Sequence, residues 1–218
     1  MVCGQLLRAD AAAGGRAAKA RRYTDTSVVR IVYLARHGET DWNAAGRWQG
    51  QSDVPLNARG REQARALGET LLHRGVTAIV SSDLSRARET ATIVGAVLGL
   101  ELAYEDPGLR ERTFGLFEGL TREECERLHP EAWQAWVGLQ KPPPGGEARE
   151  ALAERVTAAI GRASALASEP GHVVLVIAHG GAMRAAVGTA LGTTPGPVSN
   201  GALWKLEWDG GIVAAEPC

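Results

Sequence analysis

Two histidines stand directly after apolar runs, and each lies beside residues suited to binding an anion. His37 follows Arg36 at the end of the run 28–35, and His179 opens a His-Gly-Gly string after the run 173–178. A neutral imidazole can attack an electrophile through its free nitrogen, and an arginine can bind a phosphate through two parallel hydrogen bonds. Either histidine alone is more often a hydrogen-bonded structural residue, but the repeated arrangement favours a phosphate site.

A third apolar run, 76–81, brings further arginines to the same kind of position. Arg86 and Arg88 fall at the start of the helix predicted after it. Two positions apart on a helix, they point about 200° away from each other, so only one can face the pocket. The helix that begins at Gly180 would add free N–H groups and the positive end of its dipole. Together these features predict a pocket for a phosphate-bearing ligand.

The elements that must position these residues alternate between strands and helices. Strands are expected at 28–35, 76–81, 100–104, 173–178 and 203–208, and helices are expected to begin near Asn57, Asp83, Thr121, Pro130, Glu147 and Gly180. Such alternation produces a sheet covered on both faces, and ligands bind beyond the carboxyl ends of its strands. We therefore expect an α/β fold, a three-layer α/β/α sandwich with a mostly parallel central sheet.

The composition limits the classes of function. The chain has 218 residues, a formal net charge of -1 and three cysteines that lie far apart. These values argue against nucleic-acid binding and against a disulfide framework, and no apolar run is long enough to span a bilayer. We expect a cytoplasmic protein without nucleic-acid or membrane partners, with homodimerisation left open. Residues 1–27 are expected to form a disordered extension, and residues 28–218 the single domain.

Several other catalytic signatures are absent from the sequence. There is no G-x-G of a dinucleotide fold, no Gly-Lys of a Walker A loop, no G-x-S-x-G elbow and no HExxH zinc motif. Two arginines near one centre would also repel a divalent cation. We therefore expect neither a metal nor a cofactor.

The ordered set of motifs resembles the histidine phosphatase superfamily, whose members have the phosphoglycerate-mutase-like fold. The string RHGET at 36–40 resembles the superfamily signature. Four further stretches agree in order and spacing, namely 81–87, 109–115, 144–147 and 178–181. The resemblance covers about residues 29–206, and it implies that 28–218 is a histidine phosphatase domain.

The resemblance implies a role for each matching residue. His37 would be the nucleophile that becomes phosphohistidine, and Glu111 would give a proton to the leaving oxygen. His179 would be the second histidine of the phosphate pocket, while Arg36 and Arg86 would hold the phosphoryl oxygens. Asn43 would reach the phosphate, and Gly180 is expected to bind the substrate or its phosphate. The loop residues Arg47, Gln49 and Gly50 would face the substrate.

Two departures and one aromatic pair concern the surroundings of the pocket. Phe117 stands where relatives often carry tryptophan, and Ala148 stands where serine or threonine is frequent. Because alanine cannot cap a helix with its side chain, the loop carrying Glu147 should be held less tightly. Trp133 and Trp136 are expected either to roof the pocket or to bury against the sheet.

The same pocket could serve a phosphatase or a mutase. The stretch between Glu111 and His179 is compact, and the chain stops soon after the last predicted strand. Both features resemble the bacterial broad-specificity or sugar-phosphate phosphatases. We therefore expect a metal-independent phosphomonoester hydrolase that acts through phosphohistidine on a small phosphorylated metabolite. The alternatives are a 2,3-bisphosphoglycerate-dependent phosphoglycerate mutase and, third, an inactive phosphate-binding module.

Overall fold

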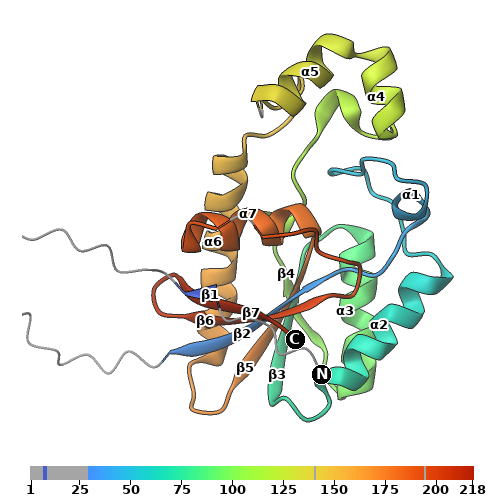
Figure 1. Ribbon diagram of the computed structural model, residues 1–218. Coiled ribbons are helices and arrows are strands. Elements are labelled where there is room, and N and C mark those ends of the chain that lie inside the picture. Colours follow the sequence, from blue (N-terminus) through green and yellow to red (C-terminus); the bar gives the residue numbers. More distant parts are fainter. Residues whose placement is uncertain (1–6, 9–28, 140, 194) are drawn as a thin grey trace, which may run out of the picture.

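One mixed sheet organises the chain, which the computed structural model describes at residues 7–8, 29–139, 141–193 and 195–218. The described strands follow the order β1-β7-β6-β2-β5-β3-β4 (Figure 1). The parallel part comprises β2 (Arg30–Arg36), β5 (Val173–Ala178), β3 (Val76–Ser81) and β4 (Leu102–Glu105), and the antiparallel edge comprises β6 (Leu203–Trp208), β7 (Ile212–Pro217) and β1 (Leu7–Arg8). The expected α/β fold is confirmed, although β7 was not predicted.

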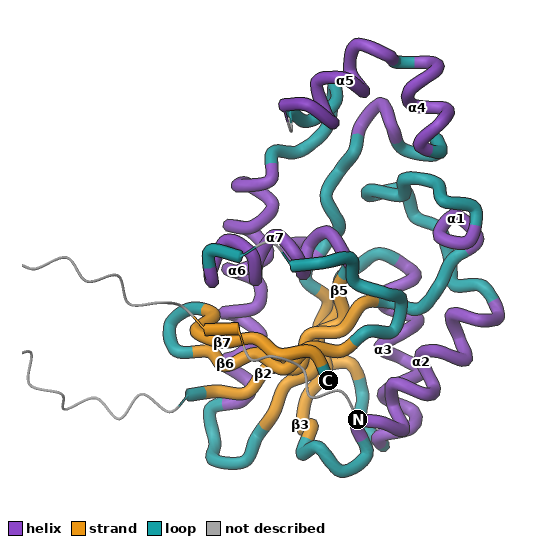
Figure 2. The backbone as a smooth tube through the Cα atoms, viewed as in Figure 1, coloured by secondary structure: helices purple, strands orange, loops and turns teal. Residues whose placement is uncertain are grey.

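Helices cover both faces of this sheet, as Figure 2 shows. Helices α2 (Ala58–Leu71) and α3 (Ser85–Leu98) pack on one face, and α6 (Arg149–Ser164) and α7 (Gly180–Leu191) pack on the other. Along β2, Val32 and Leu34 join the core under α6 and α7, whereas Tyr33 and Ala35 join the core under α2 and α3. Successive strand residues face opposite sides, so a strand covered on both faces needs the continuous apolar run seen in the sequence.

Local signals start and stop most of the helices where the sequence predicted. Asn57 accepts a hydrogen bond from the N–H of Gly60 (2.8 Å) at the start of α2, and Gly99 ends α3 with φ 71°. The expected capping box at Thr121 opens α4 (Arg122–Leu128). The prediction that Asp83 caps α3 is wrong, because its carboxylate accepts hydrogen bonds from Arg110 instead (Nε–Oδ1 2.7 Å) and Leu84 occupies the cap.

Residues 115–139, which we call the cap, stand apart from the sandwich (Figure 1). The cap contains η2 (Gly115–Phe117), α4 and α5 (Pro130–Leu139), and Phe117 and Trp133 are buried with Cys125 in its own small core. Trp136 packs against Trp48, with ring centroids 5.8 Å apart. Trp133 therefore buries within the cap and not against the sheet, from which Figure 1 shows α5 well separated. Trp136 instead lines a cavity together with Trp48 and Phe114.

The remaining short elements are α1 (Asp41–Ala44), η1 (Pro107–Leu109) and η3 (Ala165–Ala167). No helix in the described part of the chain has the length and apolar character needed to cross a membrane. The extension predicted at residues 1–27 lies outside the described residues, apart from Leu7–Arg8, which pair with β7.

Candidate active site

The pairing of β2 with β5 brings the two histidines together. The strands are parallel with Arg36 opposite Ala178, so the next residue of each chain segment leaves the sheet at the same point. The N–H of His37 donates to the carbonyl of Ala178 (3.0 Å), and the rings of His37 and His179 lie 5.0 Å apart between centroids. Both side chains are buried. Strand register therefore explains why two distant His-Gly strings form one site.

A cavity of about 360 Å³ opens over these strand ends. Every predicted site residue except His179 lines it, and His179 lies against the ring of His37. The predicted residues in its wall are Arg36, His37, Asn43, Arg47, Gln49, Gly50, Arg86, Glu111 and Gly180. Gly181, from the His-Gly-Gly string, also lines the cavity, together with Trp48 and Phe114. The lining residues that sequence reasoning did not name are Gly46, Arg184, Pro197 and Val198.

His37 is held as a neutral imidazole with one defined free nitrogen. Burial, and then the guanidiniums of Arg86 and Arg36, keep the pKa of His37 well below its usual value. Its Nδ1 lies 2.6 Å from the carbonyl oxygen of Gly38. Because a carbonyl can only accept, Nδ1 carries the proton and Nε2 keeps its lone pair. This is the protonation state that a nitrogen nucleophile requires.

Two guanidiniums, of the fully buried Arg86 and the half-buried Arg36, converge on the cavity. Arg86 is fully buried, donates to the carbonyls of Ser52 (2.8 Å) and Gly50 (2.8 Å), and has a pKa lowered by burial to about 10, so it stays charged at neutral pH. Arg36 donates to the carbonyl of Val198 (2.7 Å). The Nε atoms of both arginines are buried without a partner in the described structure. Unpaired buried donors of this kind are costly unless an anion accepts from them.

The structure distinguishes Arg86 from its neighbour Arg88. The guanidinium of Arg88 lies 3.5 Å from the carboxylate of Glu105, and its side chain is 48% exposed. Arg88 therefore points out to solvent, as their separation on the helix requires.

His179 occupies the N-cap position of α7 without making a side-chain capping bond. Neither ring nitrogen has a partner among the described residues, and burial, followed by the charge of Arg86, keeps the pKa of His179 well below its usual value. In its neutral form one ring nitrogen still carries a proton. His179 can therefore donate one hydrogen bond to an anion in the pocket.

Glu111 is fixed at the edge of the cavity by backbone donors. Its Oε1 accepts from the N–H of Arg112 (2.7 Å), and its Oε2 accepts from the N–H of Gly181 (2.8 Å) in the first turn of α7. Nη2 of Arg155 donates to the backbone carbonyl of Glu111 (2.9 Å). The carboxyl group therefore has a defined position in the wall of the cavity.

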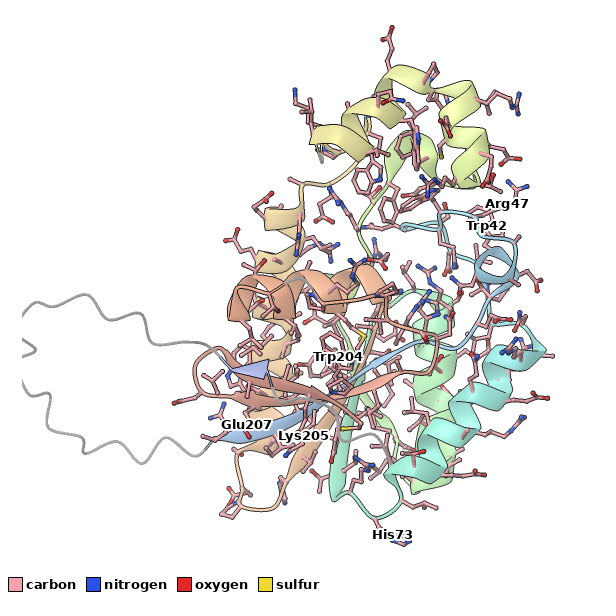
Figure 3. The ribbon with its side chains drawn as sticks, in the orientation of Figure 1. Trp42, Arg47, His73, Trp204, Lys205 and Glu207 are labelled. Atoms are coloured by element: carbon pink, nitrogen blue, oxygen red, sulfur yellow. The ribbon has the colours of Figure 1, made fainter. Side chains whose placement is uncertain are left out.

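The residues predicted to face the substrate differ in what they can offer. Asn43 belongs to the capping box of α1, where its Oδ1 accepts from Thr40 (3.2 Å). Gln49 is buried, and its Oε1 has no partner in the described structure. Arg47 lies in the cavity wall, but its guanidinium forms an ion pair with Glu124 of α4 (2.7 Å). Figure 3 labels Arg47 near Trp42. Arg47 thus links the cap to the loop after α1, and its charge is already paired with a carboxylate.

Asn200 is a site residue that sequence reasoning missed. Its Nδ2 lies within hydrogen-bond distance of the carbonyls of His37 (3.1 Å) and Gly38 (3.2 Å) and of Oδ1 of Asn43 (3.1 Å). It therefore holds the carbonyl that orients the His37 ring. The only sequence signal was the Asn-Gly pair at 200–201, a common turn dipeptide.

Arg155 is a second residue that sequence reasoning missed, and it holds the loop that precedes α6. Ala148 makes no side-chain capping bond, as expected. The carboxylate of Glu147 is instead held by Arg155 through two contacts, from Nε (2.7 Å) and Nη2 (2.8 Å). The loop is therefore anchored, contrary to the expectation that it would be loosely held.

Known proteins are similar to this chain in sequence. The family model described as histidine phosphatase superfamily (branch 1) matches residues 32–215. A protein of Salmonella newport named "Probable phosphoglycerate mutase GpmB" is 43% identical over 169 residues, which are 74% of this chain and 74% of its own.

Solved structures agree with the sequence match. A mycobacterial glucosyl-3-phosphoglycerate phosphatase in complex with VO3 has a TM-score of 0.75 and 34% identity, covering 86% of this chain and 97% of that one. Bacillus stearothermophilus YhfR has a TM-score of 0.73 and 32% identity, covering 84% and 93%. The paired histidines, the two arginines of the cavity and these matches together show that the chain belongs to the histidine phosphatase superfamily.

Proposed function

We propose that this protein is a metal-independent phosphomonoester hydrolase that acts through a phosphohistidine at His37 on a small phosphorylated metabolite. The observation that carries the proposal is the state of His37, a neutral imidazole whose Nε2 is free beside two guanidiniums. The unpartnered Nε atoms of Arg36 and Arg86 supply donors for phosphoryl oxygens.

In the first step, Nε2 of His37 attacks phosphorus while the bond from phosphorus to the ester oxygen breaks. Arg36 and Arg86 neutralise the charge on the equatorial oxygens, and His179 donates a further hydrogen bond. Phosphoryl transfer depends mainly on such positioning and charge stabilisation. Glu111 acts as the general acid and gives a proton to the leaving oxygen, so the alcohol departs neutral.

In the second step, Glu111 accepts a proton from a water molecule as the water oxygen attacks the phosphohistidine. The bond between phosphorus and Nε2 breaks, which releases inorganic phosphate and restores neutral His37 and protonated Glu111. The positive charge needed in both steps comes from the arginines. Among the described residues, no group of three or more histidine, cysteine, aspartate or glutamate side chains could hold a metal ion.

A mutase is the second candidate, because the curated relative carries the name of a phosphoglycerate mutase. A mutase would return the phosphoryl group from His37 to a second hydroxyl of the bound acid. We favour hydrolysis because two of the solved structures that match most of this chain are named as phosphatases, and because the stretch between Glu111 and His179 is compact. We also place the enzyme in the cytoplasm, where the thiols of Cys125 and Cys218, free in the structure, would stay reduced.

The test is a panel of phosphomonoesters assayed in chelator, with 3-phosphoglycerate present both with and without 2,3-bisphosphoglycerate. We expect vanadate-sensitive phosphate release that His37→Ala abolishes. The matched control is His73→Ala, because His73 is exposed and lies at the opposite end of the molecule from the cap (Figure 3). Activity that survives His37→Ala, or that requires a divalent ion, would refute the mechanism. Efficient isomerisation with little phosphate release would favour the mutase.

The role of Glu111 has its own test. Glutamine cannot give up a proton, so Glu111→Gln should slow alkyl phosphates far more than 4-nitrophenyl phosphate, whose leaving group needs no acid. A general acid typically contributes ~10²–10⁴ in rate. Equal losses on both kinds of ester would show that Glu111 does not protonate the leaving group.

A further inference from the structure

The carbonyls that hold Arg86 belong to residues 50–52, which we call the 50–52 loop. Gly50 and Ser52 each accept from one Nη atom of Arg86 (2.8 Å each). The unpartnered Nε of Arg86 is the donor that remains for a phosphoryl oxygen. Because a guanidinium is planar and rigid, the direction of its Nε–H depends on where these two carbonyls lie. The position of the loop therefore sets the geometry of Arg86.

One carboxylate, that of Glu118 in the cap, contacts every residue of the 50–52 loop. Its Oε2 accepts from the N–H (3.1 Å) and the Oγ (2.7 Å) of Ser52, and its Oε1 accepts from the N–H of Gln51 (3.3 Å). A Cβ on Gly50 would overlap the same carboxylate, so the loop packs directly against it. Glu118 thus holds the loop through charge-assisted hydrogen bonds, which are stronger than neutral ones.

Glu118 is also bound to the stretch of chain that leads into the cap. Its Oε1 accepts from Oγ1 of Thr113 (2.9 Å) and from the N–H of Phe114 (3.0 Å). Burial raises the pKa of Glu118, but the hydrogen bonds from Ser52, Thr113, Phe114 and Gln51 outweigh this effect and hold the pKa below its ordinary value. The side chain is therefore an anion at neutral pH, and it joins two segments that are distant in the sequence.

Glu118 is not among the residues that line the cavity of about 360 Å³, so its effect on the reaction must pass through another residue. We propose that Glu118 is a positioning residue for phosphoryl transfer, which fixes the 50–52 loop so that Nε of Arg86 meets the phosphoryl oxygens. The inference rests on the proposed function, because Arg86 must bind the phosphoryl group that His37 receives.

The proposed acid, Glu111, depends less on the 50–52 loop. Its carbonyl accepts from Nε2 of Gln51 (3.2 Å), but it also accepts from Nη2 of Arg155 (2.9 Å). Its carboxylate is held by two backbone N–H groups that lie outside the loop. A shift of the loop should therefore displace Arg86 and leave the proton donor in place.

Glu118→Gln is the test, because glutamine keeps the shape of the side chain and replaces one oxygen by NH2. Backbone N–H groups face both oxygens, from Ser52 at one and from Gln51 and Phe114 at the other, and an N–H cannot accept. Either orientation of the amide therefore leaves a donor unpaired and loosens the loop. We expect kcat to fall by about 10²-fold, the scale of a misplaced catalytic group, with KM changed by less than about threefold. The loss should be equal on alkyl phosphates and on 4-nitrophenyl phosphate, because Arg86 acts on the phosphoryl group that all these esters share.

Two further variants accompany this one. Glu126→Gln makes the same chemical change at an exposed position of α4 in the cap and should leave kcat unchanged. Ser52→Ala removes only the hydroxyl donor and keeps the loop backbone, so it serves if the Glu118→Gln protein does not fold. Its kcat should fall by about tenfold, the scale of one charge-assisted hydrogen bond.

A double variant shows whether Glu118 acts through Arg86. In the Arg86→Lys protein the guanidinium fork is already absent, so adding Glu118→Gln or Ser52→Ala should cost less than about threefold in kcat. Losses that multiply would overturn the inference, as would single variants that unfold at lower urea yet keep the wild-type kcat, or a loss confined to alkyl esters. Each of these outcomes leaves the phosphatase proposal intact, whereas a wild-type protein that hydrolyses no ester refutes that proposal and this inference with it.

Discussion

Replacing Arg86 with lysine separates the charge of this residue from its geometry. Arg86 uses one Nη atom on the carbonyl of Ser52 and the other on the carbonyl of Gly50, which leaves Nε for the pocket. Lysine keeps the positive charge but has a single nitrogen. It cannot bind both carbonyls of the 50–52 loop and also donate to a phosphoryl oxygen along a fixed direction.

The size of the effect follows from these contacts. Loss of one preorganised donor to the transition state costs ~10²–10³ in kcat, or about 2.7–4 kcal/mol. Lysine can still bind one of the two loop carbonyls, so the free energy of unfolding should fall by about one charge-assisted hydrogen bond, ~1.5–3 kcal/mol. A domain with ~5–15 kcal/mol of stability survives that loss, so the Arg86→Lys protein should remain folded.

Two measurements check this prediction, namely kcat/KM on 4-nitrophenyl phosphate and urea unfolding. Arg88→Lys is the matched control, because Arg88 lies on the same helix and its salt bridge to Glu105 is exposed to solvent. Such surface changes usually alter stability by less than ~0.5 kcal/mol. An Arg86→Lys enzyme that stays folded and keeps activity within about threefold of wild type would refute the role given to the guanidinium fork.

Three further predictions concern protonation, packing and positioning. Burial lowers the pKa of both pocket histidines, so the unfolded state binds more protons than the folded state below about pH 6.5. The free energy of unfolding, measured in urea, should therefore fall between pH 7 and 5 by up to ~1.4 kcal/mol per pH unit for each histidine. An unfolding free energy that does not change over this range would contradict the prediction. Gly38→Ala should lower the free energy of unfolding by ~1–3 kcal/mol, because a Cβ at this position would overlap the backbone of Gly60. The control Gly138→Ala adds a Cβ that meets no other atom, so it should be neutral or stabilising by ~0.5–1 kcal/mol. Equal free energies of unfolding for the two variants would contradict the packing argument. Asn200→Ala should lower kcat by about tenfold with less change in KM, because it frees the carbonyl that orients His37, the proposed nucleophile. An unchanged kcat would exclude that role for Asn200.

Much of the pocket could be predicted because its main residues follow strand ends. Apolar runs identify strands that are buried on both faces, and parallel strands present their carboxyl ends at one edge. Arg36, His37 and His179 were therefore placed by elementary rules before any contact was known. The resemblance to a family then selected Arg86 and Glu111, which the rules alone left open or unassigned.

The rest depended on contacts that local sequence does not encode. Asn200 binds residues more than 150 positions away, and Arg36 donates to the backbone carbonyl of Val198, a group that every residue carries. Asp83 looked like a helix cap because its type is favoured there, but a distant arginine takes its carboxylate. The cap was missed as a unit because its aromatic residues form a core of their own, separate from the sheet.

The central claim is that Nε2 of His37 receives the phosphoryl group, because Nδ1 is held by the carbonyl of Gly38. Phosphohistidine hydrolyses in acid but survives in base. The measurement is therefore to quench the reaction rapidly in base during turnover and to locate the phosphoryl group by peptide mass spectrometry and ³¹P NMR. The account predicts a phosphoryl group on His37, bound at Nε2 and absent from the His37→Ala protein. Phosphorylation at Nδ1 of His37, or on His179, would contradict this claim. Oxygen-isotope exchange that shows direct attack of water on the substrate would also contradict it.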